Sequence, residues 1–82
     1  MNTDNSHLQA AIEAVQRKDM ITATVEATKA IQEDPDCYEA YIIRGQISMA
    51  FGDKRGAAED MKRALEIRPD LQEQLNGQFQ NI

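Results

Sequence analysis

The sequence of 82 residues predicts an all-α fold: two antiparallel helical hairpins, stacked as a short right-handed solenoid, followed by a C-terminal capping helix. Three observations favour this fold. Positions that lie about 34 residues apart, such as Asp19 and Asp53, carry matching residue types along most of the chain. Only two prolines and four glycines interrupt the sequence, which favours long helices. The apolar side chains are mostly small or aliphatic, with no tryptophan, and such side chains suit close contacts between helices.

This internal repeat is the main signal. When the sequence is aligned with itself at this spacing, five identical pairs coincide: Asp19 with Asp53, Ala23 with Ala57, Ala30 with Ala64, Pro35 with Pro69, and Asp36 with Asp70. Three pairs of similar residues also coincide: Glu26 with Asp60, Lys29 with Arg63, and Ile31 with Leu65. A period of about 34 residues is typical of stacked helical repeats, and we call this interval the repeat period. We therefore divide the single domain 1–82 into a first unit, 4–37, a second unit, 38–71, and a terminal segment, 72–82.

The second unit carries a known pattern. It has an aromatic residue, a glycine, two alanines and a proline at fixed spacing, at Tyr41, Gly45, Ala57, Ala64 and Pro69. This pattern resembles the tetratricopeptide repeat family, whose unit has the same period. The chain departs from the family at three positions, where the family has leucine, tyrosine and phenylalanine: Arg44, Ser48 and Met61. The resemblance implies that the first helix of each unit lines a concave groove that binds partner proteins.

The first unit, more degenerate, predicts helices at about 5–17 and 20–33. Asp4 or Ser6 is expected to cap the first helix, and Asp19 follows the turn and can cap the second. Ala11 and Ala23 are expected where the two helices touch. A proline at the end of each unit disfavours helical geometry in the residue before it.

The second unit repeats this order, with helices expected at about 37–50 and 54–67. Gly52 supplies the left-handed residue of the turn between them. Beyond Pro69, a further helix is expected at about 71–80. Its apolar residues recur at helical spacing, at Leu71, Leu75, Phe79 and Ile82. We expect this helix to cover the open end of the preceding one, since the last repeat of an array otherwise exposes its stacking face.

Composition excludes several function classes. The net charge is −5, and the first half of the chain carries eight acidic residues against three basic ones. Nucleic-acid binding needs clustered cations, so we expect no nucleic-acid partner. The longest apolar stretches are far shorter than a membrane helix, so no membrane partner is expected, and residues 1–7 do not resemble a signal peptide. One cysteine forms no intrachain disulfide, which favours a reducing, cytoplasmic location.

The sequence offers little for catalysis. His7 is the only histidine and occupies the position of an aromatic residue in the repeat, where packing or exposure is the simpler interpretation. Cys37 lies between the units with no second histidine to activate it, so we interpret it as a structural thiol. The acidic residues Glu33, Asp34 and Asp36 suit a solvated turn before a helix N-terminus. We expect no catalytic residue, metal or cofactor.

The first helix of each unit, at about 5–17 and 37–50, is called its leading helix. The expected binding surface is the inner face of these two leading helices. Its residues are mostly apolar: Leu8, Ile12, Val15, Ile42, Gln46 and Met49. Some family members bind acidic chaperone tails through basic residues and asparagine in this groove, and those residue types are missing here. An apolar groove suits an amphipathic helix instead. That helix could come from another protein, from a second copy or from the chain's own tail.

The sequence therefore predicts a non-enzymatic module for protein–protein interaction, an adaptor that binds a peptide or an amphipathic helix. Three alternatives stay open. The chain could self-associate, because two repeats fall short of the roughly three that an isolated array needs. It could be part of a longer array or of a multidomain protein. It could also be an enzyme with an unfamiliar site.

Overall fold

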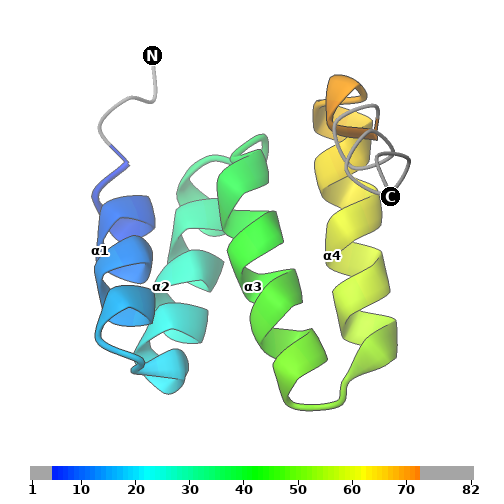
Figure 1. The fold of residues 1–82 in the computed structure, drawn as a ribbon. Coiled ribbons are helices and arrows are strands. Elements are labelled where there is room, and N and C mark those ends of the chain that lie inside the picture. The colour runs from blue at the N-terminus through cyan, green and yellow to red at the C-terminus, as the bar shows by residue number, and fades with distance from the viewer. Residues whose placement is uncertain (1–4, 73–82) are drawn as a thin grey trace.

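The computed structural model describes residues 5–72, and every regular element in this range is a helix (Figure 1). The helices are α1 (Ser6–Gln16), α2 (Met20–Glu33), α3 (Tyr38–Ala50) and α4 (Lys54–Ile67). The four predicted ranges are confirmed to within one residue at each end. Residues 70–72 are also helical, and the rest of the expected terminal helix lies outside the described residues. No described helix has the length and hydropathy needed to span a membrane.

The helix starts follow from side-chain caps. Asp19 accepts a hydrogen bond from the Thr22 amide at 3.1 Å, and Asp53 accepts one from the Gly56 amide at 3.0 Å. Each cap satisfies an amide that has no partner within its helix. The predicted cap of α1, Asp4 or Ser6, was wrong, because the N-cap is Asn5, whose side chain accepts a hydrogen bond from the Leu8 amide at 3.1 Å. The Asn5 side chain also donates to the Ala30 carbonyl, which ties the start of α1 to α2.

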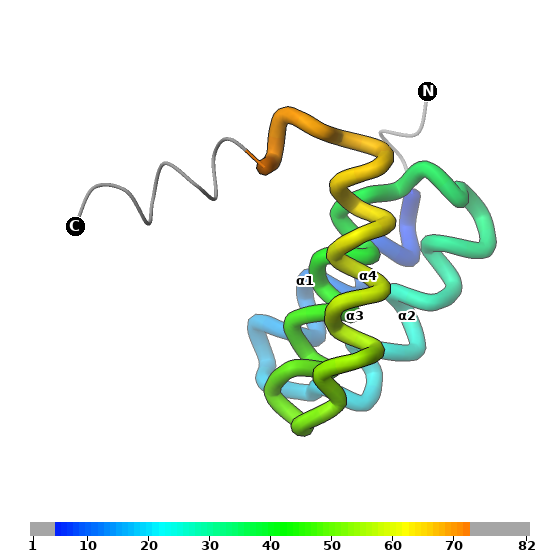
Figure 2. Tube along the Cα trace, turned by 90° about the vertical axis from the view of Figure 1, so that its right-hand side faces the viewer, coloured from blue at the N-terminus to red at the C-terminus, as the bar shows by residue number. Residues whose placement is uncertain are grey.

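The helices form an up-and-down row in chain order, in which α1 and α3 run parallel and α2 and α4 run the opposite way (Figure 1). Contacts join α1 to α2 and α3 to α4, and α3 also contacts both α1 and α2. Among the described helices, α4 contacts α3 alone. Figure 2 views the molecule from the α4 side, with α3 and α4 in front of the first hairpin. One side of α4 is therefore without a neighbouring helix in the described part of the chain.

The core is made of small side chains. Six alanines have no exposed surface: Ala11, Ala14, Ala23, Ala27, Ala30 and Ala40. No large side chain in residues 5–72 is fully buried. The helices consequently approach closely, as expected from the sequence for Ala11 and Ala23. At Gly45 a Cβ atom would lie 3.3 Å from the Asp60 Cβ and 3.4 Å from the Ala57 carbonyl oxygen, so α3 and α4 touch where glycine leaves room.

Candidate functional site

An apolar hollow lies between α1 and α3. Ile12 and Val15 come from α1 and Ile43 and Gln46 from α3, and they line, together with Gln16, a pocket of about 190 Å³. A neighbouring pocket of about 170 Å³ shares Val15, Ile43 and Gln46 with it. Its further lining residues are Met20, Ile47 and Ala50. We call these two connected pockets the α1/α3 trough.

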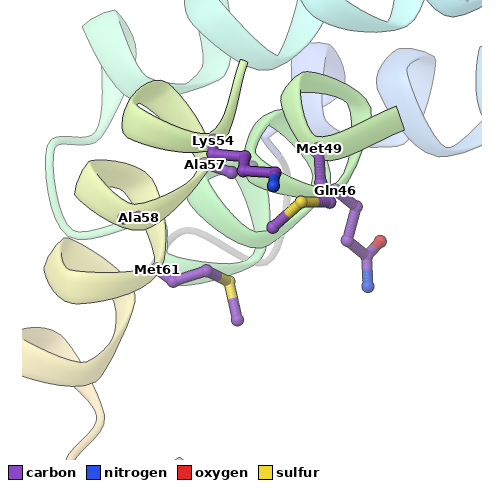
Figure 3. A pocket seen from close by; sticks show the side chains of 7 residues that line it. Gln46, Met49, Lys54, Ala57, Ala58 and Met61 are labelled. Atoms are coloured by element: carbon purple, nitrogen blue, oxygen red, sulfur yellow. The ribbon is translucent and has the colours of Figure 1, made fainter. Parts of the chain in front are cut away.

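A second hollow lies between α3 and α4 and has a volume of about 230 Å³ (Figure 3). Its lining residues are Gly45, Gln46, Met49, Lys54, Ala57, Ala58 and Met61. The thioether side chains of Met49 and Met61 reach this space from the two helices, and Lys54 lies beside Met49 (Figure 3). We call it the α3/α4 pocket. Methionine side chains adapt their shape easily, which suits a surface that accommodates a partner.

The structure places the six residues of the predicted groove in different surroundings. Ile12, Val15 and Gln46 line the α1/α3 trough, and Gln46 and Met49 line the α3/α4 pocket. Leu8 instead packs against the buried alanines of the first hairpin. Ile42 is half-buried and lies outside the pockets described here.

Sequence reasoning missed several lining residues, above all Ile43 and Met61. Ile43 lines both parts of the α1/α3 trough and also packs against the buried core. The signal that could have found it is its position one turn before Gln46 and Ile47 on the same helix. Met61 lies one turn after Ala57 and Ala58 on α4, and this helical spacing could have placed it beside them in the pocket.

The charged side chains near these hollows form pairs that the sequence did not predict. Arg44 binds Asp60 through two hydrogen bonds of 2.9 Å and also donates to the Thr28 hydroxyl at 3.3 Å. The hydrogen bonds to Asp60 raise the pKa of Arg44 above its ordinary value. Because Thr28, Arg44 and Asp60 belong to α2, α3 and α4, this group holds the second hairpin against the first.

The first hairpin carries a comparable group. The His7 Nδ1 atom lies 2.7 Å from a Glu26 oxygen, and its Nε2 atom lies 3.4 Å from a Glu33 oxygen. Glu26 and Asp60 are one repeat period apart, so both hairpins place a carboxylate at the same position of their second helix. His7 thus lies between two carboxylates of α2.

Cys37 is a buried free thiol that belongs to one core cluster with Ala11, Ala27, Ala30 and Ala40. Burial raises the pKa of its thiol, which lowers the fraction of reactive thiolate near neutral pH. Within residues 5–72, no three histidine, cysteine, aspartate or glutamate side chains are placed to hold a metal ion.

Comparisons with known proteins add no relative to this picture. No protein-family model matches the chain, and no curated protein or solved structure is significantly similar to it. The functional interpretation rests on the geometry of the two hollows.

Proposed function

We propose that this chain is a non-catalytic adaptor built from two tetratricopeptide-type repeats, which binds an amphipathic helix or an apolar peptide in the α1/α3 trough. The observation that carries the proposal is the trough itself. Three branched apolar side chains, Ile12, Val15 and Ile43, line it from two parallel helices. Apolar surface gathered in a hollow is typical of interaction sites. An amphipathic helix would cover these side chains with its apolar face.

The repeat interpretation has its own support. Both hairpins use an aspartate cap after a left-handed residue, alanines at the helix contact, and a carboxylate paired with the facing helix. Each of these features recurs after one repeat period. In a right-handed stack of such hairpins, the leading helices α1 and α3 lie next to each other and form the inner surface, which supports their role in binding.

The test is affinity capture with the intact chain and three variants. Ile12→Asp and Gln16→Asp each introduce a carboxylate into the trough, and Gln16 is exposed and lies outside the α3/α4 pocket, so the second change leaves the core intact and tests this trough alone. Both should reduce the retention of a bound partner at least about tenfold, because a buried unpaired charge strongly opposes binding. Ile21→Asp is the matched control: Ile21 is 76% exposed on α2 and lies outside the trough, so this variant should retain the partner.

Circular dichroism separates loss of binding from loss of folding in these variants. If Ile12→Asp and Gln16→Asp keep the helical signal and capture the same proteins as Ile21→Asp, the α1/α3 trough is not the binding site. If Ile12→Asp loses the helical signal, Gln16→Asp alone decides the result, since its side chain is exposed on the surface.

A further inference from the structure

The first hairpin shows how the groove between two helices of a unit is filled. The helix α3 lies on the pair α1 and α2 and presents one row of side chains to it, Ala40, Ile43 and Ile47. Under this row, Ala11 and Ala23 have no exposed surface. The spacing i, i+3 and i+7 places the three side chains of the row on one face of α3. The contact is thus a parallel helix that supplies a small residue and two isoleucines.

The second hairpin has the same groove without a covering helix in the described part of the chain. The lining residues Gly45, Met49, Ala57 and Met61 of the α3/α4 pocket follow those of the covered groove by one repeat period. The corresponding positions of the first hairpin are Ala11, Ala23 and Ala27, which have no exposed surface, and Val15, which is half-buried. Met49 is 55% exposed and Ala58 is also exposed, and α4 contacts no described helix except α3.

The chain itself offers no second helix with the row that α3 uses. The positions one repeat period before that row are Ser6, Gln9 and Glu13, which are polar and exposed on α1. The positions one repeat period after it are Gln74, Gly77 and Asn81, which also lack apolar side chains. In the repeat register, neither α1 of a second copy nor the chain's own terminal segment would fill the pocket with apolar atoms, because the apolar residues predicted to cover the end of the preceding helix, Leu75, Phe79 and Ile82, lie outside that register.

The charges around the pocket disfavour a symmetric pairing of two copies and favour an acidic partner. Lys54 lines the pocket, and Arg55 and Lys62 lie one turn on either side of Ala58 along α4. None of these three cations forms an ion pair with another residue of 5–72. A face-to-face dimer would bring these like charges together, whereas a helix with acidic residues would pair with them.

The covered groove also indicates where the acidic residue of such a helix lies. Arg44 of α3 donates a hydrogen bond to Thr28 of α2 at 3.3 Å. The position one repeat period after Thr28 is Lys62. A helix that lies on the second hairpin as α3 lies on the first would therefore bring its residue at the Arg44 position next to Lys62. A glutamate there would complete a charge pair, and an arginine would be repelled.

We propose that the α3/α4 pocket binds an acidic amphipathic helix of another protein, parallel to α3, with the row alanine, isoleucine and isoleucine at i, i+3 and i+7. A glutamate directly after the first isoleucine pairs with Lys62. The proposal concerns a second surface, beyond the α1/α3 trough, and is independent of binding in that trough.

Three synthetic peptides test this proposal against the full chain by fluorescence anisotropy. The first has the sequence of residues 36–51 with Arg44→Glu, and the second keeps the arginine. The third carries Arg44→Glu together with Ile43→Gln and Ile47→Glu, which replaces the two isoleucines of the row by the residue types that α1 has at Gln9 and Glu13. The first peptide should bind at least about tenfold more tightly than the second, because of the charge at Lys62. The third should not bind, because it lacks the apolar row.

A charge exchange in the protein makes the test specific. Lys62→Glu should reverse the order of the first two peptides, and Lys29→Glu, an exposed basic residue of α2, is the matched control that should leave it unchanged. Ala58→Glu should abolish binding of the first peptide, and both Lys62 and Ala58 are exposed, so these variants should keep the helical signal.

Four results would overturn the proposal. The first is that the acidic peptide does not bind the full chain. The second is that Lys62→Glu leaves the order of the peptides unchanged. The third is that the peptide binds only after Phe79→Asp in the full chain, which would show that the terminal segment occupies the pocket. The fourth is a dimer in sedimentation velocity that dissociates on Ala58→Glu, which would show that a second copy covers this face.

Discussion

At the scale of single residues, positions 18 and 52 show how the same backbone is built with two different side chains. Lys18 has φ of 64° and Gly52 has φ of 86°, and both follow the C-cap residue of a leading helix, Arg17 in α1 and Phe51 in α3. In each turn the amide of the next residue, Asp19 or Asp53, reaches back to the carbonyl of Ala14 or Ser48 at 2.8 Å. This is the Schellman motif, which needs a left-handed residue. Glycine adopts that conformation freely, and lysine adopts it at a cost.

The first prediction exchanges these residues. Lys18→Gly should raise the free energy of unfolding by about 0.5–1 kcal/mol. The change relieves the strain of the left-handed conformation, and the greater entropy of glycine in the unfolded chain offsets part of this gain. Gly52→Lys should lower it by about 1 kcal/mol. Urea denaturation followed by circular dichroism measures both. Arg17→Gly is the control: Arg17 has φ of −84°, so glycine brings no relief there and should destabilise. Changes of the same sign at positions 18 and 52 would contradict this account.

At the scale of elements, the contact between α3 and α4 joins small residues to one charged pair. Asp60 is a buried carboxylate, and the Arg44 guanidinium meets it with two nearly equal hydrogen bonds. Bidentate geometry of this kind is stronger and more directional than a single bond. Because Gly45 leaves no side chain between the helices at this point, the close approach and the ion pair depend on each other.

The second prediction separates the pair from its surroundings. Asp60→Ala should lower the free energy of unfolding by about 2 kcal/mol, because it leaves the half-buried guanidinium of Arg44 without its carboxylate. The double variant Arg44→Leu with Asp60→Ala should be more stable than Asp60→Ala alone, since it removes the unpaired charge and places an apolar residue at that position. Urea denaturation of the four proteins of the cycle gives the coupling energy. A double variant less stable than Asp60→Ala alone would show that the pair is not the cause.

The sequence predicts the elements well and the contacts between them less well. Helix bounds follow from local signals, such as the aspartate caps and the left-handed glycine, and these were confirmed at Asp19, Asp53 and Gly52. The cap of α1 was misassigned because three neighbouring polar residues can all cap, and only the contact between Asn5 and the Ala30 carbonyl of α2 distinguishes them.

The candidate site depends on which faces meet in space, and a single sequence shows this only partly. The helical spacing of the apolar residues in α1 predicted that Ile12 and Val15 belong to the groove, and both line the α1/α3 trough. On α3, apolar residues occur on more than one face. Their spacing along the helix therefore does not distinguish Ile42, which lies outside the trough, from Ile43, which lines it. Arg44 and Asp60 belong to different helices, so their ion pair could be predicted only from the way in which α3 and α4 pack together.

At the scale of the whole molecule, the two ends of the helical row differ in chemistry. The outer face of α1 presents Ser6, Gln9 and Glu13, all exposed, at the positions where α3 presents its apolar row. The other end presents the apolar α3/α4 pocket. Two copies therefore lack the complementary faces that would let them stack as α3 stacks on the first hairpin. The polar end acts against such stacking, in the way that polar terminal repeats keep helical arrays soluble.

The third prediction converts the polar end into a stacking face. Gln9→Ile with Glu13→Ile gives α1 the two isoleucines of the α3 row, and both positions are exposed, so the fold should be kept. The variant should then associate end to end, with α1 of one copy in the α3/α4 pocket of the next. Each isoleucine buried there contributes about 1.5–3 kcal/mol, so self-association should strengthen by at least roughly 100-fold. Because this contact does not close on itself, the assembly should grow with concentration instead of stopping at a dimer. Sedimentation velocity over a concentration series measures this, and adding Ala58→Glu to the same chain should restore the behaviour of the parent. The double variant could sediment as its parent does at every concentration, or it could associate equally with Ala58→Glu present. Either result would show that the α3/α4 pocket does not correspond to the covered groove of the first hairpin.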